Sequence, residues 1–80
     1  MLDELLEALH KKRVFVKFEK QNGDWRLMTC TRNPRLVHTA KVKFPIDNSD
    51  IVTVWDFEKD NYRTFKRNSV VAWAALGLNS

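Results

Sequence analysis

Residues 51–73, IVTVWDFEKDNYRTFKRNSVVAW, contain the pattern that decides the fold. Two runs rich in β-branched and aromatic residues, 51–57 and 62–66, flank the polar segment 58–61. Such a polar segment can connect two antiparallel strands that each bury one face, so the pattern predicts a β-hairpin. A short apolar run at 70–73 follows almost directly. So abrupt a change from one strand to the next is typical of a small bent barrel.

The preceding part of the chain predicts another hairpin. Residues 14–20 alternate between the two faces of a strand, and residues 25–31 form the returning strand. Asn22-Gly23 is the strongest turn signal of the chain, because both residue types tolerate the positive φ that a primed two-residue turn requires. Alternation alone does not decide which face of the returning strand points inward.

The N-terminal residues predict an amphipathic helix. Its apolar stripe consists of leucines spaced at i, i+3, i+4 and i+7, namely Leu2, Leu5, Leu6 and Leu9. Acidic residues precede basic ones along this segment, an order that complements the helix dipole. We expect the helix to cover one mouth or edge of the sheet. The alternative is that its leucines bind in a groove of a partner protein.

Less regular segments lie between the hairpins and at the C-terminus. Pro34 can start a short helical turn, and residues 38–50 suit a surface loop. Three alternating apolar residues of this loop could instead add a short strand, namely Val42, Phe44 and Ile46. Residues 74–78 favour a final apolar turn that ends at Gly77.

Together these elements predict a mainly β (α+β) fold, a small five-stranded SH3/Sm-like barrel with an N-terminal amphipathic helix. Eighty residues allow a single domain at 1–80, with the helix at 1–13, the barrel at 14–73 and a tail at 74–80. The expected core includes Val52, Val54, Phe65, Val70 and Trp73.

Composition limits the compartment and the kind of partner. The formal charge of +4 permits nucleic acid or an acidic protein as the partner. The single Cys30 excludes an internal disulfide and a multi-cysteine zinc site, and it suits a reducing compartment. The sequence shows neither a secretory signal nor a run of about 20 apolar residues that could span a bilayer. We expect a cytoplasmic protein without a membrane partner.

The two predicted hairpins carry short motifs of a known family. In the first hairpin these are residues 16–20 with Gly23, Arg26, Met28, Cys30 and Thr31. In the second half they are Val52, Val54, Trp55, Asp56, Arg63, Phe65, Ser69 and Val70. Residues 62–65 and 67–71 also follow the family pattern of an aromatic residue, an arginine and an aromatic residue before a polar turn and an aliphatic strand. On these motifs residues 14–73 resemble a family of small bacteriophage proteins whose Sm-like SH3 β-barrel is related to the WYL (Trp-Tyr-Leu) ligand-sensing domains of bacterial regulators. The resemblance implies such a barrel and a location in the host bacterial cytoplasm. The chain has no Trp-Tyr-Leu tripeptide and no helix-turn-helix.

The sequence offers little for catalysis. His10 and His38 belong to no metal-ligand spacing, and Cys30 with a remote histidine is a weak pattern for a nucleophile. A glycine-rich phosphate loop is excluded, because the chain has only 2 glycines. We expect no enzyme activity, no cofactor and no metal site, with Cys30 as a small apolar strand residue.

Asp56 and Arg63 lie on either side of the predicted turn at 58–61. One hypothesis is a salt bridge between them that closes the hairpin. The other is that Arg63 remains available to bind a phosphate or carboxylate with its planar guanidinium.

Basic residues also occur where the predicted strands meet loops. Brought together with three aromatic residues they would form a positive rim, and its members are Arg32, Arg35, Lys41, Lys43, Arg63, Lys66, Arg67, Trp25, Trp55 and Tyr62. Cations beside aromatic rings are a common way to bind single-stranded nucleic acid. The alternative is a solvated basic surface with the aromatic residues in the core.

Two classes of function remain open. The first is a non-enzymatic bacteriophage accessory or regulatory protein that binds RNA, DNA or a nucleic-acid-handling complex. The second is a protein-interaction module that modulates a host protein, such as the transcription machinery or a defence enzyme. Assembly of several copies through sheet edges into an Sm-like ring is a third possibility.

Overall fold

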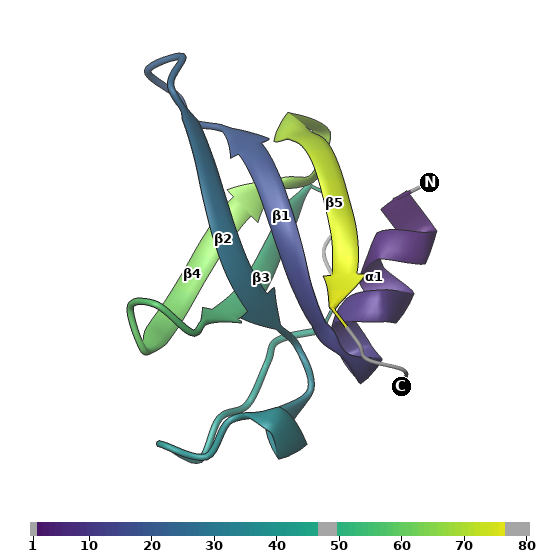
Figure 1. Cartoon of the computed structure of the whole chain (residues 1–80), viewed down its shortest axis with the longest axis vertical. Coiled ribbons are helices and arrows are strands. Elements are labelled where there is room, and N and C mark those ends of the chain that lie inside the picture. Colours follow the sequence, from purple (N-terminus) through teal and green to yellow (C-terminus); the bar gives the residue numbers. More distant parts are fainter. Residues whose placement is uncertain (1, 47–49, 77–80) are drawn as a thin grey trace.

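A strongly bent antiparallel sheet forms the body of the protein. The computed structural model describes residues 2–46 and 50–76, with the side chains of residues 2 and 3 outside the description. The elements are α1 (Leu2–Lys11), β1 (Arg13–Glu19), β2 (Trp25–Thr31), the 3-10 turn η1 (Pro34–Leu36), β3 (Ile51–Asp56), β4 (Asn61–Lys66), the 3-10 turn η2 (Arg67–Ser69) and β5 (Val70–Leu76). The sheet order is β4-β3-β2-β1-β5 (Figure 1). The predicted small Sm-like/SH3 barrel with an N-terminal helix is therefore confirmed.

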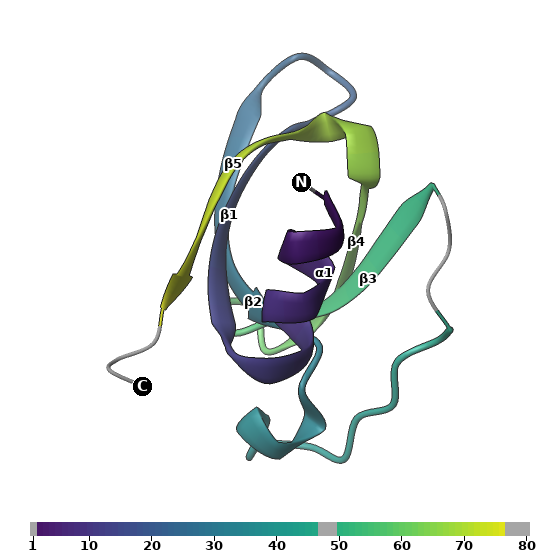
Figure 2. The same ribbon diagram turned by 90° about the vertical axis from the view of Figure 1, so that its right-hand side faces the viewer.

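The sheet bends between β2 and β3, where pairing is short. Only Cys30↔Asp56 and Thr31↔Trp55 are in register there. At the other side β5 pairs with β1, with an irregularity in the register between Lys17 and Phe18. Figure 2 shows the result, a curved sheet whose open mouth is occupied by α1.

The β1–β2 hairpin has the predicted strands and a different turn. Gly23 has φ 91°, whereas Asn22 is not in the positive-φ region. The Gly23 N–H donates to the Lys20 carbonyl at 2.9 Å, and the Lys20 N–H donates to the Asp24 carbonyl at 2.7 Å. The prediction of a two-residue primed turn is wrong, because these bonds define a three-residue loop with one left-handed residue.

The β3–β4 hairpin is confirmed, and its register runs from Ile51↔Lys66 to Asp56↔Asn61. Its loop closes through the Asp60 N–H, which donates to the Asp56 carbonyl at 2.8 Å. Asp60 takes the left-handed conformation, with φ 54°. Aspartate tolerates this region better than most residues, since its short side chain can hydrogen-bond locally.

The last strand is longer than the sequence suggests. β5 continues to Leu76, so residues 74–76 form strand and the predicted apolar turn over 74–78 is wrong for them. Gly77 and Leu78, the other residues of that predicted turn, lie outside the described residues. Three small side chains, Ala72, Ala74 and Ala75, belong to this strand where it pairs with β1.

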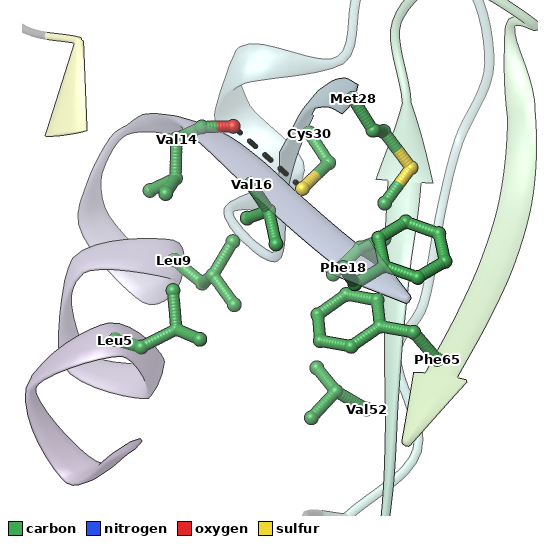
Figure 3. Packing of buried hydrophobic residues seen from close by; sticks show 10 residues of the cluster. Leu5, Leu9, Val14, Val16, Phe18, Met28, Cys30, Val52 and Phe65 are labelled. Atoms are coloured by element: carbon green, nitrogen blue, oxygen red, sulfur yellow. Dashed lines mark hydrogen bonds between the residues drawn. The ribbon is translucent and has the colours of Figure 1, made fainter. Parts of the chain in front are cut away.

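The core lies between the concave face of the sheet and α1 (Figure 3). Leu5 and Leu9 of α1 are 1% and 0% exposed, which confirms that the helix packs on its own barrel. Leu6 is half-buried against the same cluster, and the side chain of Leu2 lies outside the described residues. The buried cluster consists of Leu5, Leu9, Val14, Val16, Phe18, Met28, Cys30, Val52, Val54 and Phe65. Of the expected core residues, Val70 and Trp73 are only partly buried and pack against this cluster.

The long connection between β2 and β3 begins with the predicted helical turn. Asn33 Oδ1 accepts a hydrogen bond from the Arg35 N–H at 3.0 Å, and Pro34 occupies the first position of η1. Within the described part of the connection, 37–46 and 50, no strand forms, so the suggested short strand through Val42, Phe44 and Ile46 is wrong. Ile46 is 93% exposed. Residues 47–49 of the predicted loop lie outside the described residues. No helix of the described chain is long and apolar enough to cross a membrane.

Candidate nucleic-acid interface

The predicted basic and aromatic rim does not form one surface. The β1–β2 turn and the connection after β2 lie at opposite ends of the barrel in both views (Figures 1 and 2). Trp25 starts β2 next to the first of these, whereas Lys41 and Lys43 belong to the second. β4 runs between these two ends. Tyr62, near the start of β4, and Lys66, at its end, therefore lie at different ends of the barrel.

Two residues of the predicted rim are buried. Trp55 is 5% exposed, and its ring lies perpendicular to that of Tyr62 with centroids 5.2 Å apart. Arg32 is 4% exposed, lies over the Phe44 ring at 5.5 Å and donates to the Pro45 carbonyl. The expectation that Trp55 and Arg32 lie on an accessible rim is therefore wrong. Arg32 binds the long connection through Phe44 and Pro45, and Trp55 packs against Tyr62 of β4.

Tyr62 also anchors the connection between β2 and β3. Its hydroxyl accepts a hydrogen bond from the Lys43 N–H at 2.9 Å, and its ring meets that of Phe44 edge-on at 5.8 Å. Tyr62 nevertheless remains 42% exposed. The side chains of Arg35, Lys41 and Lys43 are exposed on the same connection. Part of the predicted rim therefore forms at this end of the barrel, and there Tyr62 also holds the connection in place.

Asp56 is the centre of the charge cluster inside the barrel. Its side chain is 0% exposed, and Oδ2 lies 3.1 Å from Arg26 Nη2 and 3.4 Å from Arg63 Nε. Its Oδ1 accepts from the N–H groups of Glu58 and Lys59 at 2.9 and 3.2 Å. The salt-bridge hypothesis for Asp56 and Arg63 is therefore confirmed, and the same carboxylate also shapes the turn.

Sequence reasoning missed Arg26 as the second partner of Asp56. Arg26 shares the inward face of β2 with Met28 and Cys30, since residues at i, i+2 and i+4 of a strand point the same way. Cys30 lies opposite Asp56 in the sheet, so the side chains of this face lie on the same side of the sheet as the Asp56 carboxylate. The alternation was visible in the sequence, but the inward face and the β2–β3 register were not.

A cleft of about 540 Å³ opens beside this charge cluster. It lies between the end of the β1–β2 hairpin and β4, and its lining residues are Phe18, Glu19, Lys20, Gln21, Arg26, Ile51, Arg63, Thr64, Phe65, Lys66 and Ser69. Its apolar part contains the stacked rings of Phe18 and Phe65, with centroids 5.3 Å apart. The volume is within the range of about 300–1,000 Å³ that is usual for ligand sites.

The charge of the cleft is positive. Four of its lining side chains are cationic, namely Lys20, Arg26, Arg63 and Lys66, and Glu19 is its acidic one. With the buried Asp56 beneath, the local formal charge is four minus two, or +2. Arg63 and Lys66 belong to the predicted rim, whereas Lys20 and Arg26 do not. Arg67, also predicted, lies in η2 directly after β4.

The single thiol is chemically quiet. Burial, and secondarily the Asp56 carboxylate, raise the pKa of Cys30 from 9.0 to about 12. Its Sγ donates to the Val14 carbonyl at 3.7 Å (Figure 3). In the part of the chain that the structure describes, no group of three or more His, Cys, Asp or Glu side chains could hold a metal ion.

The bent five-stranded sheet with a helix in its mouth defines a small Sm-like/SH3 barrel with a cationic cleft. A family model described as "WYL_2, Sm-like SH3 beta-barrel fold" matches residues 2–71. The chain therefore belongs to the WYL_2 family, which confirms the barrel implied by the hairpin motifs. Comparison with curated proteins gave no match, and comparison with solved structures gave none either.

Proposed function

We propose that this protein is a non-enzymatic accessory or regulatory protein that binds single-stranded nucleic acid through the cleft between the β1–β2 hairpin and β4. The observation that supports this proposal is the convergence of four cationic side chains on one cleft. The bacteriophage origin that we attach to it rests on the resemblance of the hairpin motifs.

The two arginines of the cleft are suited to bind phosphate. Asp56 fixes both guanidinium groups through one oxygen. Apart from these contacts, neither Arg26 nor Arg63 forms a hydrogen bond to another described side chain or backbone group. Each guanidinium carries five N–H donors in a fixed plane. The Nε atoms of both arginines are buried without a hydrogen-bond partner, so the terminal amino groups are the donors that remain for a ligand. The arginines are thus positioned without being saturated.

The two lysines extend the charge to the surface, since Lys20 and Lys66 are exposed. Phe18 and Phe65 are each 5% exposed, so they provide an apolar floor and little ring face for a base to stack on. Binding should therefore be driven by the phosphates, with little preference for sequence. Such binding releases counterions and weakens steeply with salt.

The lack of catalysis is part of this proposal. A thiol with a pKa raised to about 12 carries almost no thiolate at neutral pH, so Cys30 would be a poor nucleophile. His10 lies in α1 and His38 in the connection after β2, in different elements from the cleft.

The test is a fluorescence anisotropy titration with labelled oligo(dT) and oligo(rU) over a series of salt concentrations. The slope of log K against log[salt] is about −0.7 for each phosphate contact of a single strand. Replacing Lys20→Gln and Lys66→Gln together should reduce the slope by about 1.4 and weaken binding at low salt.

The matched control is Lys41→Gln with Lys43→Gln, two exposed lysines that do not line the cleft. This pair should leave the slope unchanged. Lack of binding to either oligonucleotide at low salt would refute the proposed function. An equal loss of slope in the control pair would place the interface on the connection after β2 instead.

A further inference from the structure

The convex surface of β1, β2 and β5 carries exposed apolar side chains that no described element covers. We call it the outer face, and its members are Arg13, Phe15, Lys17, Glu19, Trp25, Leu27, Thr29, Ala72, Ala74 and Leu76. Phe15, Trp25 and Leu27 are 38%, 58% and 51% exposed. α1 packs against the opposite, concave face (Figure 2).

The register makes these side chains neighbours. Lys17 lies opposite Leu27 of β2 and Ala72 of β5, and Phe15 lies opposite Ala74 of β5. On the two sides of a strand the side chains alternate, so Phe15 and Lys17 share the face opposite the buried Val14, Val16 and Phe18. The small alanines leave the larger side chains standing above the sheet. A contiguous exposed apolar patch of this kind marks an interaction surface.

Two cations are part of the outer face. Lys17 Nζ lies 4.0 Å from the centroid of the Trp25 ring, and Arg13 Cζ lies 4.6 Å from that of Phe57. Among the described residues neither cation forms an ion pair with a carboxylate. They are four residues apart on β1, which corresponds to about 13 Å along a strand. The acid nearest in register is Glu19, opposite Trp25 at the hairpin end, and it also lines the cleft.

We propose that the outer face binds an acidic, apolar peptide segment of a partner protein. Carboxylates of that segment would pair with Arg13 and Lys17, and its apolar side chains would cover Phe15, Leu27 and the alanines of β5. This site is separate from the cleft, so it goes beyond the proposed function and does not depend on it.

Charge selects this partner over two others. A second copy of the chain would present the same face, with two cations and Glu19 as its one acid, and each copy carries +4. A nucleic acid would find Lys17 already lying over the Trp25 ring, where a base would stack, and only two cations for its phosphates, with Phe15 between them. An acidic and apolar segment satisfies both the cations and the apolar surface between them.

The experiment is an NMR titration of the ¹⁵N-labelled full chain with a synthetic amphipathic peptide of Glu and Leu. The indole N–H of Trp25 and the amides of β1, β2 and β5 should shift on binding. Lys17→Glu should weaken binding about tenfold, and Leu27→Ser should weaken it at least severalfold. Both side chains are on the surface, so the variants should keep the barrel, which their spectra would verify.

Two controls sharpen the result. Lys41→Glu makes the same charge change on the connection after β2 and should leave peptide affinity unchanged. A peptide with Lys in place of Glu should not bind. The inference is overturned if the acidic peptide shifts the amides of the cleft instead, if Lys17→Glu leaves its affinity unchanged, or if oligo(dT) shifts the outer-face signals. It is also overturned if these signals shift with protein concentration alone, which would indicate a second copy.

Discussion

Replacing Asp56→Asn removes the buried negative charge that two arginines share. The amide keeps nearly the same shape, and its oxygen can still accept from the N–H groups of Glu58 and Lys59. The ion pairs of Oδ2 with Arg26 at 3.1 Å and with Arg63 at 3.4 Å are lost. The substitution therefore isolates the charge of Asp56 from its role in the turn.

The expected loss of stability is large for so small a protein. Removing one partner of a buried ion pair costs about 3–5 kcal/mol. The side chains of Arg26 and Arg63 remain 20% and 34% exposed, so solvent can recover part of this loss. We expect the free energy of unfolding to fall by about 3 kcal/mol. A chain of 80 residues has about 4–12 kcal/mol in total.

Urea unfolding followed by tryptophan fluorescence measures this difference, and thermal melts provide a second measure. A loss of about 3 kcal/mol corresponds to a decrease in Tm of about 12–24 °C for a domain of this size. The control is Asp60→Asn in the same loop, an exposed residue whose φ of 54° asparagine also accepts. If Asp56→Asn costs less than about 1 kcal/mol, or no more than Asp60→Asn, the two ion pairs are not a significant source of stability.

Three further predictions concern the thiol, the first turn and the helix. Because the pKa of Cys30 is raised from 9.0 to about 12, the unfolded chain loses this proton first, so this thiol should not change the stability below pH 9 and should lower it as pH rises toward 12. Urea unfolding across this range checks this, with Cys30→Ala as the control. Gly23→Ala has open space at its Cβ but a φ of 91°, so it should cost about 1–2 kcal/mol, and Gly23→Asn should cost less in the same assay. Leu9→Ala removes a fully buried side chain and should cost about 2–5 kcal/mol, whereas a helix that did not pack on the barrel would tolerate it. A cost below about 1 kcal/mol would contradict the packing of α1.

The fold was largely predictable because its signals are local. The period of the leucines in α1 and the alternation in 14–20 each report the element and the face that it buries, and the runs at 51–57 and 62–66 report their hairpin. The turn after β1 shows the limit of such local reading. Asn22-Gly23 correctly predicted the place of the turn, but the loop length depends on which strand residues pair, and Lys20 pairs with Asp24.

The tail shows a second limit. Residues 74–76 read as an apolar turn when taken alone, whereas in the structure they extend β5 along β1 to the pair Arg13↔Leu76. Pairing between strands that are more than fifty residues apart supplies the backbone hydrogen bonds that make the extended form stable. Propensity within the segment contains no information about that neighbour.

The candidate site was harder to predict than the fold, because a long charged side chain is positioned by its tertiary neighbours. Arg26, Arg32 and Arg63 are chemically identical, and only Arg63, across the predicted turn from Asp56, has a position in the sequence that indicates its partner. The structure gives them different roles: Arg32 is 4% exposed and fastens a loop, while Arg26 and Arg63 meet at Asp56 beside the cleft. The difference comes from one buried carboxylate on the neighbouring strand.

Asp56 also links the stability of the fold to the positive charge on which the proposed binding depends. A buried carboxylate is costly unless its charge is offset, and two guanidinium groups offset it with one positive charge to spare. The spare charge remains at the wall of the cleft, where Lys20 and Lys66 add to it. Loss of either arginine would therefore weaken the fold and the positive field together. Replacing the exposed lysines would change the positive field of the cleft and leave the fold intact. For this reason the lysine variants are the direct test of nucleic-acid binding.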